Sequence, residues 1–301
     1  MKRLLGLGLL AAALLAAQTG NTYFVIVGGL GGEADYEQRF NSYVSDLDKL
    51  CRTLAGDVSR VTALSGKSAT KEAVQSVLTK LASTTTAADA VAVFLIGHGT
   101  YDGTVYKFNI AGPDLTQEDL KSWLDRIKAG RQLLVVATSS SGVLAEQLQR
   151  DNRVVVTATR SGTERNAVVF SRYWVEALRD PAADSDKNET ISALEAFRYA
   201  DEKVKRFFTE QKRLATEHAR LEGKIAGTFV LARMGQAAQA ALDPAKRKLL
   251  AERESFEQQI DALKLRKSAL PADQYRKELE RLLLELAKIQ DTIEGGGAAQ
   301  P

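Results

Sequence analysis

The chain has 301 residues, of which 45% are hydrophobic and 26% are charged, an ordinary composition for a soluble globular protein with a sizeable core. Its 41 basic residues nearly balance its 38 acidic residues, for a formal net charge of +3. This near-neutral balance argues against a broad basic surface, so we expect no binding to nucleic acid.

The first 17 residues, MKRLLGLGLLAAALLAA, combine a short basic start, an apolar run and a small-residue end. This arrangement is typical of a secretory signal peptide, with cleavage expected after Ala17. The apolar run is shorter than the roughly 20 residues of a membrane-spanning helix, although a single membrane anchor is the alternative interpretation. We therefore expect an exported protein, periplasmic or extracellular, with no membrane span after cleavage.

Short apolar runs alternate with helical patterns over residues 22–235. Strands are expected at 22–32, 58–64, 89–99, 132–138 and 153–160, and helices at 34–54, 68–83, 116–130, 143–149 and 167–180. Strands that are apolar on both faces and alternate with helices indicate a mostly parallel sheet covered by helices on both sides. The expected fold class is therefore α/β.

The composition changes after Leu242, where charged residues become dense and no strand pattern is present. Residues 243–294 carry two leucine-rich helical patterns that Pro271 separates, which predicts an antiparallel, coiled-coil-like helical hairpin. One kinked helix is the alternative. The glycine-rich tail at 295–301 is expected to be disordered.

Polar and small residues follow two of the expected strands at the point where each strand ends. His98 lies between two glycines, and the stretch LLVVATSSSG at 133–142 ends in three serines and a glycine. The carboxyl ends of neighbouring parallel strands meet at one edge of a sheet, so we expect His98 to lie near Ser139. Glycine beside His98 would leave space for a substrate and free the Gly99 N–H as a donor.

These motifs resemble the caspase–legumain superfamily of cysteine peptidases, over roughly residues 22–229. The resemblance is carried by His98-Gly99, by the turn that closes in Ser141-Gly142, and by the later stretches RVVVTATRSGTERN, VFSRYWVEAL and RLATEHARLEG. In that family the His assists proton transfer, and a Cys near the end of the next strand attacks the peptide carbonyl. N–H groups at the Cys and at the glycine after the His bind the oxyanion.

Matching the closing Ser-Gly puts Ser139 in the place of the family's Cys, and a slip of one residue would put Thr138 or Ser140 there. A serine hydroxyl needs an oriented base, and no Asp can be assigned from spacing to orient His98. We therefore expect a pseudopeptidase that acts as a binding or scaffolding module. Its protein or peptide partner would bind at the strand-end cleft or at the hairpin. The alternatives are a hydrolase that uses Ser139 with His98 as acid and base, and a resemblance of fold alone.

The acidic stretch DSDKNETISALE, at 184–195, matches the pattern of an EF-hand calcium loop. Residues with oxygen ligands occupy loop positions 1, 3, 5, 7 and 12, namely Asp184, Asp186, Asn188, Thr190 and Glu195. The departure is Glu189 at position 6, where glycine usually makes the sharp turn. We expect Ca²⁺ to bind with weakened affinity, and an acidic loop that caps a helix is the alternative.

Two further residues with reactive side chains are assigned structural roles. Cys51, the one cysteine of the sequence, falls on the apolar side of a helical pattern, so we expect it in the core. His218 lies beyond the expected sheet, and we expect it to be structural or exposed to solvent.

Overall fold

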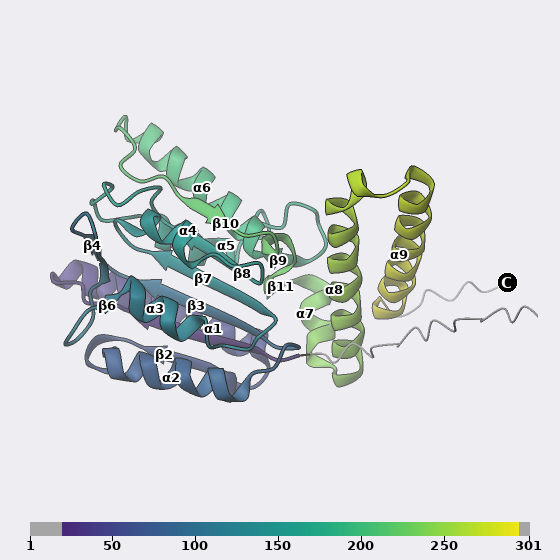
Figure 1. Cartoon of the computed structure of the whole chain (residues 1–301), viewed down its shortest axis with the longest axis horizontal. Coiled ribbons are helices and arrows are strands. Elements are labelled where there is room, and N and C mark those ends of the chain that lie inside the picture. Colours follow the sequence, from purple (N-terminus) through teal and green to yellow (C-terminus); the bar gives the residue numbers. More distant parts are fainter. Residues whose placement is uncertain (1–19, 295–301) are drawn as a thin grey trace, which may run out of the picture.

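The computed structural model describes residues 20–294 (Figure 1). The expected signal peptide at 1–17 and the expected tail at 295–301 lie outside the described residues. Within the described range, no helix is both long and apolar enough to cross a membrane.

A six-stranded sheet forms the centre of the molecule, in the order β10-β8-β7-β3-β1-β2. All neighbouring strands are parallel except β10, which is antiparallel to β8. The strands are β1 (Thr22–Gly28), β2 (Val61–Leu64), β3 (Ala90–Ile96), β7 (Arg131–Ala137), β8 (Arg153–Thr157) and β10 (Arg220–Glu222). The predicted mostly parallel α/β fold is confirmed.

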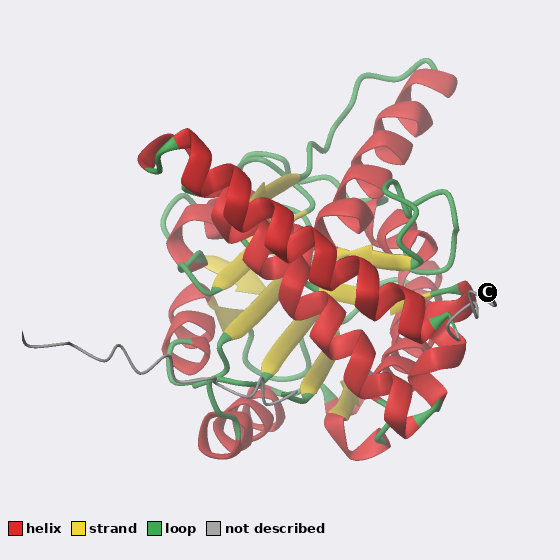
Figure 2. Cartoon of the chain, turned by 90° about the vertical axis from the view of Figure 1, so that its right-hand side faces the viewer, coloured by secondary structure: helices red, strands yellow, loops and turns green. Residues whose placement is uncertain are grey.

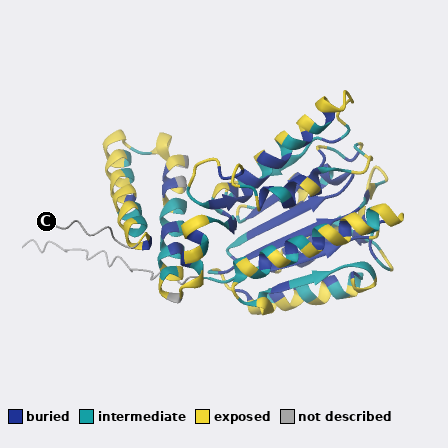
Figure 3. Ribbon diagram, turned by 180° about the vertical axis from the view of Figure 1, so that it is seen from behind, coloured by how far each residue is buried: buried dark blue, intermediate teal, exposed yellow. Residues whose placement is uncertain are grey.

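Helices cover both faces of this sheet because alternate strand residues point to opposite sides. Phe24 and Ile26 of β1 face one core, and Val25 and Val27 face the other. The first core is covered by α1 (Ala34–Ala55), α5 (Phe170–Ala177) and α6 (Ala193–Glu210), and the second by α2 (Lys71–Thr84), α3 (Gln117–Leu124) and α4 (Leu144–Leu148). The four central strands, β8, β7, β3 and β1, are buried between the two layers, and the edge strands β2 and β10 are only partly buried (Figure 3).

Two small sheets were not anticipated. One joins β4 (Gly99–Tyr101), β5 (Tyr106–Phe108) and β6 (Leu115–Thr116), and the other joins β9 (Thr190–Ser192) and β11 (Val230–Arg233).

Two expected elements are also shorter than predicted. The helix at 116–130 ends at Leu124, because Ile127 and Ala129 turn inward to fill the second core. The strand at 58–64 begins only at Val61, after a 3₁₀ turn in which the Asp57 carboxylate accepts the Ser59 N–H.

The C-terminal region is helical, with α7 (Gly235–Leu242), α8 (Pro244–Leu265) and α9 (Ala272–Ile293). Leu250 near the start of α8 packs with Ile293 at the end of α9, and Ile260 near the end of α8 packs with Leu282. This pattern makes α8 and α9 an antiparallel hairpin rather than one kinked helix (Figure 2).

The hairpin and the expected site lie at opposite ends of the sheet. Arg233 of β11 forms a 2.6 Å ion pair with Glu254 of α8, and the charge of Glu254 also acts on Arg131 at the amino end of β7. His98 and Ser139 follow the carboxyl ends of β3 and β7. β4, which begins at Gly99, lies at the end of the molecule away from α8 and α9 (Figure 1). The hairpin and the strand-end region are therefore separate surfaces.

Candidate functional site

The ends of β3 and β7 bring the His98 and Ser139 segments to one edge of the sheet. Ile96, the last residue of β3, pairs with Ala137, the last residue of β7. Two residues further along each segment are His98 and Ser139. The juxtaposition expected from the sequence is therefore present.

Gly99 packs directly against the turn that contains Ser139. A Cβ atom at Gly99 would lie 2.6 Å from the Ser139 carbonyl oxygen, 2.7 Å from the Tyr106 hydroxyl and 2.8 Å from Thr138 Oγ1. These separations are too short for any side chain. Glycine is required because the turn occupies this space, whereas the sequence suggested that a substrate would.

The N–H of Gly99 does not take part in the ladder between β4 and β5. Asn109 donates its N–H to the His98 carbonyl at 3.1 Å, and Gly99 lies opposite Phe108. In an antiparallel pair this arrangement makes Gly99 and Phe108 a non-hydrogen-bonded pair, so the Gly99 N–H points away from β5. It keeps the donor capacity that an oxyanion would need.

Aromatic rings from α1 and a backbone carbonyl fix the imidazole of His98. The rings of Tyr36 and Phe40 contact it edge-on, with centroids 4.8 and 5.0 Å away. Burial lowers the pKa of His98, against the opposing effects of a hydrogen bond to the Gly31 carbonyl and the charge of Glu33. Among the described residues, no carboxylate forms a hydrogen bond with this ring. The sequence did not reveal these neighbours, because α1 contacts His98 only in the folded chain.

The turn after β7 is buried and strained. Ser140 has a φ of +56°, a conformation uncommon for a residue other than glycine. Its N–H donates to the Glu164 carbonyl at 2.8 Å, and its buried hydroxyl has no hydrogen-bond partner among residues 20–294. The Ser141 hydroxyl donates to the Thr138 carbonyl at 2.8 Å, and the Gly142 N–H donates to Thr159 Oγ1 at 2.9 Å.

The three candidate nucleophile positions differ in their surroundings. Thr138 is fully buried, and its hydroxyl lies 2.6 Å from the Tyr106 hydroxyl and 3.1 Å from the Ser139 carbonyl oxygen. Ser140 is also fully buried, whereas Ser139 keeps 3% of its surface exposed. Ser139 is thus the most accessible of the three. Over residues 20–294, no hydrogen bond joins it to His98.

The comparison with protein families matches residues 56–218 to the model described as the peptidase C13 family. The match spans more than half of the chain and includes His98, Ser139 and Glu164. The chain belongs to the peptidase C13 family.

Comparison with solved structures gives caspase-1 from Spodoptera frugiperda, at 14% identity and a TM-score of 0.49. That alignment covers 71% of this chain and 90% of the insect protein. No curated protein matches the sequence.

A second histidine of this C13-family chain lies beside the same turn. His218 Nδ1 is 2.6 Å from Glu164 Oε1, and Glu164 is the residue whose carbonyl accepts the Ser140 N–H. His218 is half-buried and paired, not isolated. Sequence reasoning missed this pair because its members are 54 residues apart.

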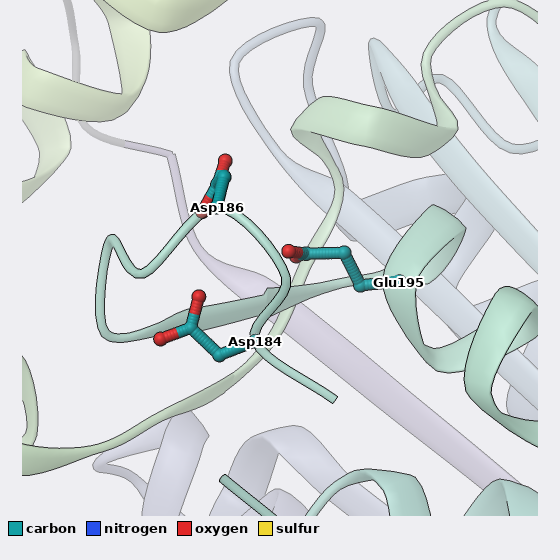
Figure 4. Close-up of side chains that lie close together, drawn as sticks. All are labelled: Asp184, Asp186 and Glu195. Carbon is teal, nitrogen blue, oxygen red and sulfur yellow. The ribbon is translucent and has the colours of Figure 1, made fainter. Parts of the chain in front are cut away.

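The acidic loop places three carboxylates around one point (Figure 4). Ligand oxygens of Asp184, Asp186 and Glu195 all lie within 4.8 Å of one another. Burial raises the pKa of Asp186, as do the charges of Glu195 and Asp184. Burial also tends to raise the pKa of Glu195, but hydrogen bonds from Ser192 and Ser185 outweigh it and hold that pKa below its usual value.

The loop adopts the left-handed turn that glycine usually provides, although Glu189 occupies that position. Glu189 has a φ of +62°. Its carboxylate accepts the Ala237 N–H at 2.8 Å in the first turn of α7, and its carbonyl accepts the Met234 N–H at 2.8 Å. These bonds to α7 explain how a glutamate is accommodated where the sequence pattern calls for glycine.

Hydrogen-bond donors of the loop already contact two of the expected calcium ligands, Glu195 and Asn188. Both oxygens of the Glu195 carboxylate accept hydrogen bonds, Oε1 from Ser185 and Oε2 from Ser192. The Asn188 side-chain oxygen accepts from the N–H and hydroxyl of Thr190 at 2.8 and 2.6 Å. Each of these three oxygens already accepts two hydrogen bonds, which occupy both of its lone pairs. A cation bound through them would have to displace a donor such as the Ser185, Thr190 or Ser192 hydroxyl.

Proposed function

We propose that this C13-family chain is an exported pseudopeptidase that binds a protein or peptide partner without cleaving it. The observation that carries the proposal is that Ser139 follows the strand beside that of His98, a histidine to which no carboxylate among the described residues is hydrogen-bonded. Its family places a cysteine nucleophile in the corresponding turn.

The chemistry of the two nucleophiles differs at neutral pH. A free thiol has a pKa of about 8.5 and is partly ionised, whereas a serine hydroxyl reacts only when an aligned base removes its proton during attack. Burial lowers the pKa of His98 and so favours its neutral imidazole, but the Gly31 carbonyl cannot stabilise an imidazolium as a carboxylate does. These properties favour binding over hydrolysis.

Two separate surfaces can receive a partner. At the strand-end edge, where the sequence predicts a cleft, the Gly99 N–H is free of the β4–β5 ladder and can donate to a peptide carbonyl. At the other end of the molecule, α9 exposes Leu283 and Leu284 by 48% and 56%. We assign the peptide contact to the cleft and a protein contact to the hairpin.

The test is labelling of the purified protein with a serine-reactive fluorophosphonate, together with a panel of peptide substrates. We expect neither stoichiometric labelling nor peptide cleavage. Ser139→Ala and His98→Ala serve as matched controls. Stoichiometric labelling that both substitutions abolish would instead establish an active hydrolase with Ser139 as nucleophile and His98 as acid and base.

We also propose that the loop at 184–195 binds Ca²⁺. The carboxylates of Asp184, Asp186 and Glu195, the Asn188 side chain and the Thr190 carbonyl would supply the oxygen ligands. The proposal is supported by the 4.8 Å clustering of the carboxylates and by the left-handed conformation of Glu189. An exported protein would meet millimolar calcium, so a site of modest affinity would fill.

A further inference from the structure

The segment from Arg160 to Glu164 lies across the turn that contains Ser139. A Cβ atom at Gly142 would lie 2.1 Å from the Arg160 carbonyl carbon and from the Ser161 nitrogen, so the two backbones are in direct contact there. At the other end of the segment, the Glu164 carbonyl accepts the Ser140 N–H at 2.8 Å.

The carboxylate of Glu164 holds this segment in place. Oε1 lies 2.6 Å from His218 Nδ1 and 3.2 Å from Arg160 Nε. Oε2 accepts the N–H of His218 at 3.2 Å and that of Arg160 at 3.0 Å. The Glu164 side chain is only 11% exposed, which strengthens these charged contacts.

The position of His218 connects this carboxylate to the edge of the central sheet. Arg220 at the start of β10 pairs with Thr157 at the end of β8, and His218 comes two residues before it. The neighbouring Glu217 is buried and accepts the Val169 N–H at the start of α5 through both oxygens, at 2.9 and 3.1 Å. The backbone on which His218 sits is therefore anchored on two sides.

The turn needs such support because its own geometry is unfavourable. Ser140 combines a positive φ with a buried hydroxyl that has no hydrogen-bond partner in the described part of the chain. Residues in this conformation persist only where the surrounding structure holds them. The bond from the Ser140 N–H to the Glu164 carbonyl is the contact that ties this strained residue to the crossing segment.

We propose that Glu164 and His218 are positioning residues of the Ser139 site. They hold the Glu164 carbonyl where it fixes the Ser140 N–H, and the fixed Ser140 conformation orients Ser139 toward His98 and the Gly99 N–H. The inference rests on the assignment of Ser139 to the nucleophile position in the proposed function. It extends that function by naming the residues that shape the site from the side opposite His98.

The first experiment uses the thiol of a Ser139→Cys variant as a reporter and measures its alkylation by iodoacetamide from pH 5 to 10. A thiol held near His98 and the Gly99 N–H should react with a midpoint below the value of about 8.5 for a free thiol. Adding Glu164→Ala or His218→Ala should raise the midpoint by about one pH unit and slow the reaction at pH 7 at least fivefold.

Two further variants separate positioning from general destabilisation. His218→Asn keeps an amide nitrogen near the place of Nδ1 and should restore most of the effect. Glu146→Ala removes a 2.6 Å ion pair between α4 and Arg220 of β10 that does not involve the Glu164 carboxylate, and it should leave the midpoint unchanged. If Glu146→Ala and Glu164→Ala raise the alkylation midpoint equally, Glu164 affects the site only through general stability. That result would overturn the proposal.

The second experiment measures hydrogen exchange of the Ser140 amide in the chain with native Ser139. Protection should fall at least tenfold in Glu164→Ala and in His218→Ala, but not in His218→Asn or Glu146→Ala. Unchanged protection of the Ser140 amide in Glu164→Ala and His218→Ala would overturn the positioning role of these two residues. It would not affect the assignment of Ser139. The thiol of the single Ser139→Cys variant can also prove unreactive while protection of the Ser140 amide falls as expected. That result would overturn the assignment of Ser139 to the nucleophile position. It would leave intact the inference that Glu164 and His218 hold the Ser140 turn.

Discussion

The carboxylate of Glu189 accepts the backbone N–H of Ala237 at 2.8 Å, which ties the acidic loop to the first turn of α7. Glu189 has a φ of +62°, so its backbone is strained, whereas its carboxylate stabilises α7 by capping it. We expect Glu189→Ala to lower the free energy of unfolding by about 1 kcal/mol, because the cap is lost and the strain remains. Glu189→Gly should cost less, since glycine relieves the positive φ. Urea unfolding of the two variants would measure the difference. Equal losses would show that backbone strain contributes little there.

Calcium should raise the melting temperature of the native protein, because a ligand that binds only the folded state stabilises it by mass action. Chelation should reverse the shift. Asp186→Asn should reduce the calcium-dependent increment, and Glu195→Ala should abolish it. For each variant, the melting temperature with Ca²⁺ must be compared with that of the same variant without Ca²⁺, since Glu195 also caps α6 through Ser192. A melting temperature unchanged up to millimolar Ca²⁺ would contradict the proposed site.

The Ser139→Cys thiol should react with iodoacetamide faster than Cys51. Cys51 is 3% exposed in the core as the sequence predicted, and burial raises the pKa of its thiol. If the variant also gains peptide hydrolysis, His98→Ala should slow that hydrolysis by about 10²- to 10⁴-fold, the usual contribution of a general acid or base. Mass spectrometry of the labelled peptides distinguishes the two thiols. If residue 139 is labelled no faster than Cys51, the assignment of residue 139 to the nucleophile position is wrong.

Glu217 should make the fold less stable as the pH rises. Burial raises its pKa to about 7, although hydrogen bonds from the backbone of Val169 and Phe170 oppose the rise. Because the pKa is higher in the folded than in the unfolded chain, folding favours the protonated form. The stability that this proton supplies is present below about pH 4.3 and is lost as the pH rises toward 7.

Glu217→Gln keeps the shape of the protonated carboxyl group and removes this titration. The variant should match the native protein near pH 4 and exceed it by roughly 3 to 4 kcal/mol at pH 8. Urea unfolding of both proteins across this pH range gives the difference, in which the titration of other carboxylates cancels. Parallel stability curves would show that Glu217 titrates alike in the folded and unfolded chains.

A chain that ends at Leu242 should keep the α/β fold and lose the association that we assign to the hairpin. The main contacts removed are the Arg233–Glu254 ion pair and the apolar packing of α7 against Leu250 and Ile293, whereas the two large cores lie on the sheet. Thermal unfolding and size-exclusion chromatography would test both expectations. Aggregation or loss of the folded baseline would show that α8 belongs to the α/β domain and that the boundary at 243 is wrong.

Local pattern was sufficient for the main elements of this chain. Runs that are apolar on both faces, such as Ala90–Ile96 and Arg131–Ala137, pack only as buried parallel strands between helices. Such strands end at a common edge, which is why the sequence predicts that His98 and Ser139 lie close together. Leucine spacing on both sides of Pro271 likewise predicted the hairpin.

The tertiary structure alone decided what surrounds those residues. The Tyr36 and Phe40 rings reach His98 from α1, and Glu164 meets His218 from 54 residues away. Glu189 finds its partner on α7, a helix that the sequence pattern did not reveal. Each of these contacts depends on how separate elements pack, and no local preference of the backbone encodes that packing. The sequence therefore determined which residues line the edge of the sheet, and the packing of distant elements determined how their side chains are oriented there.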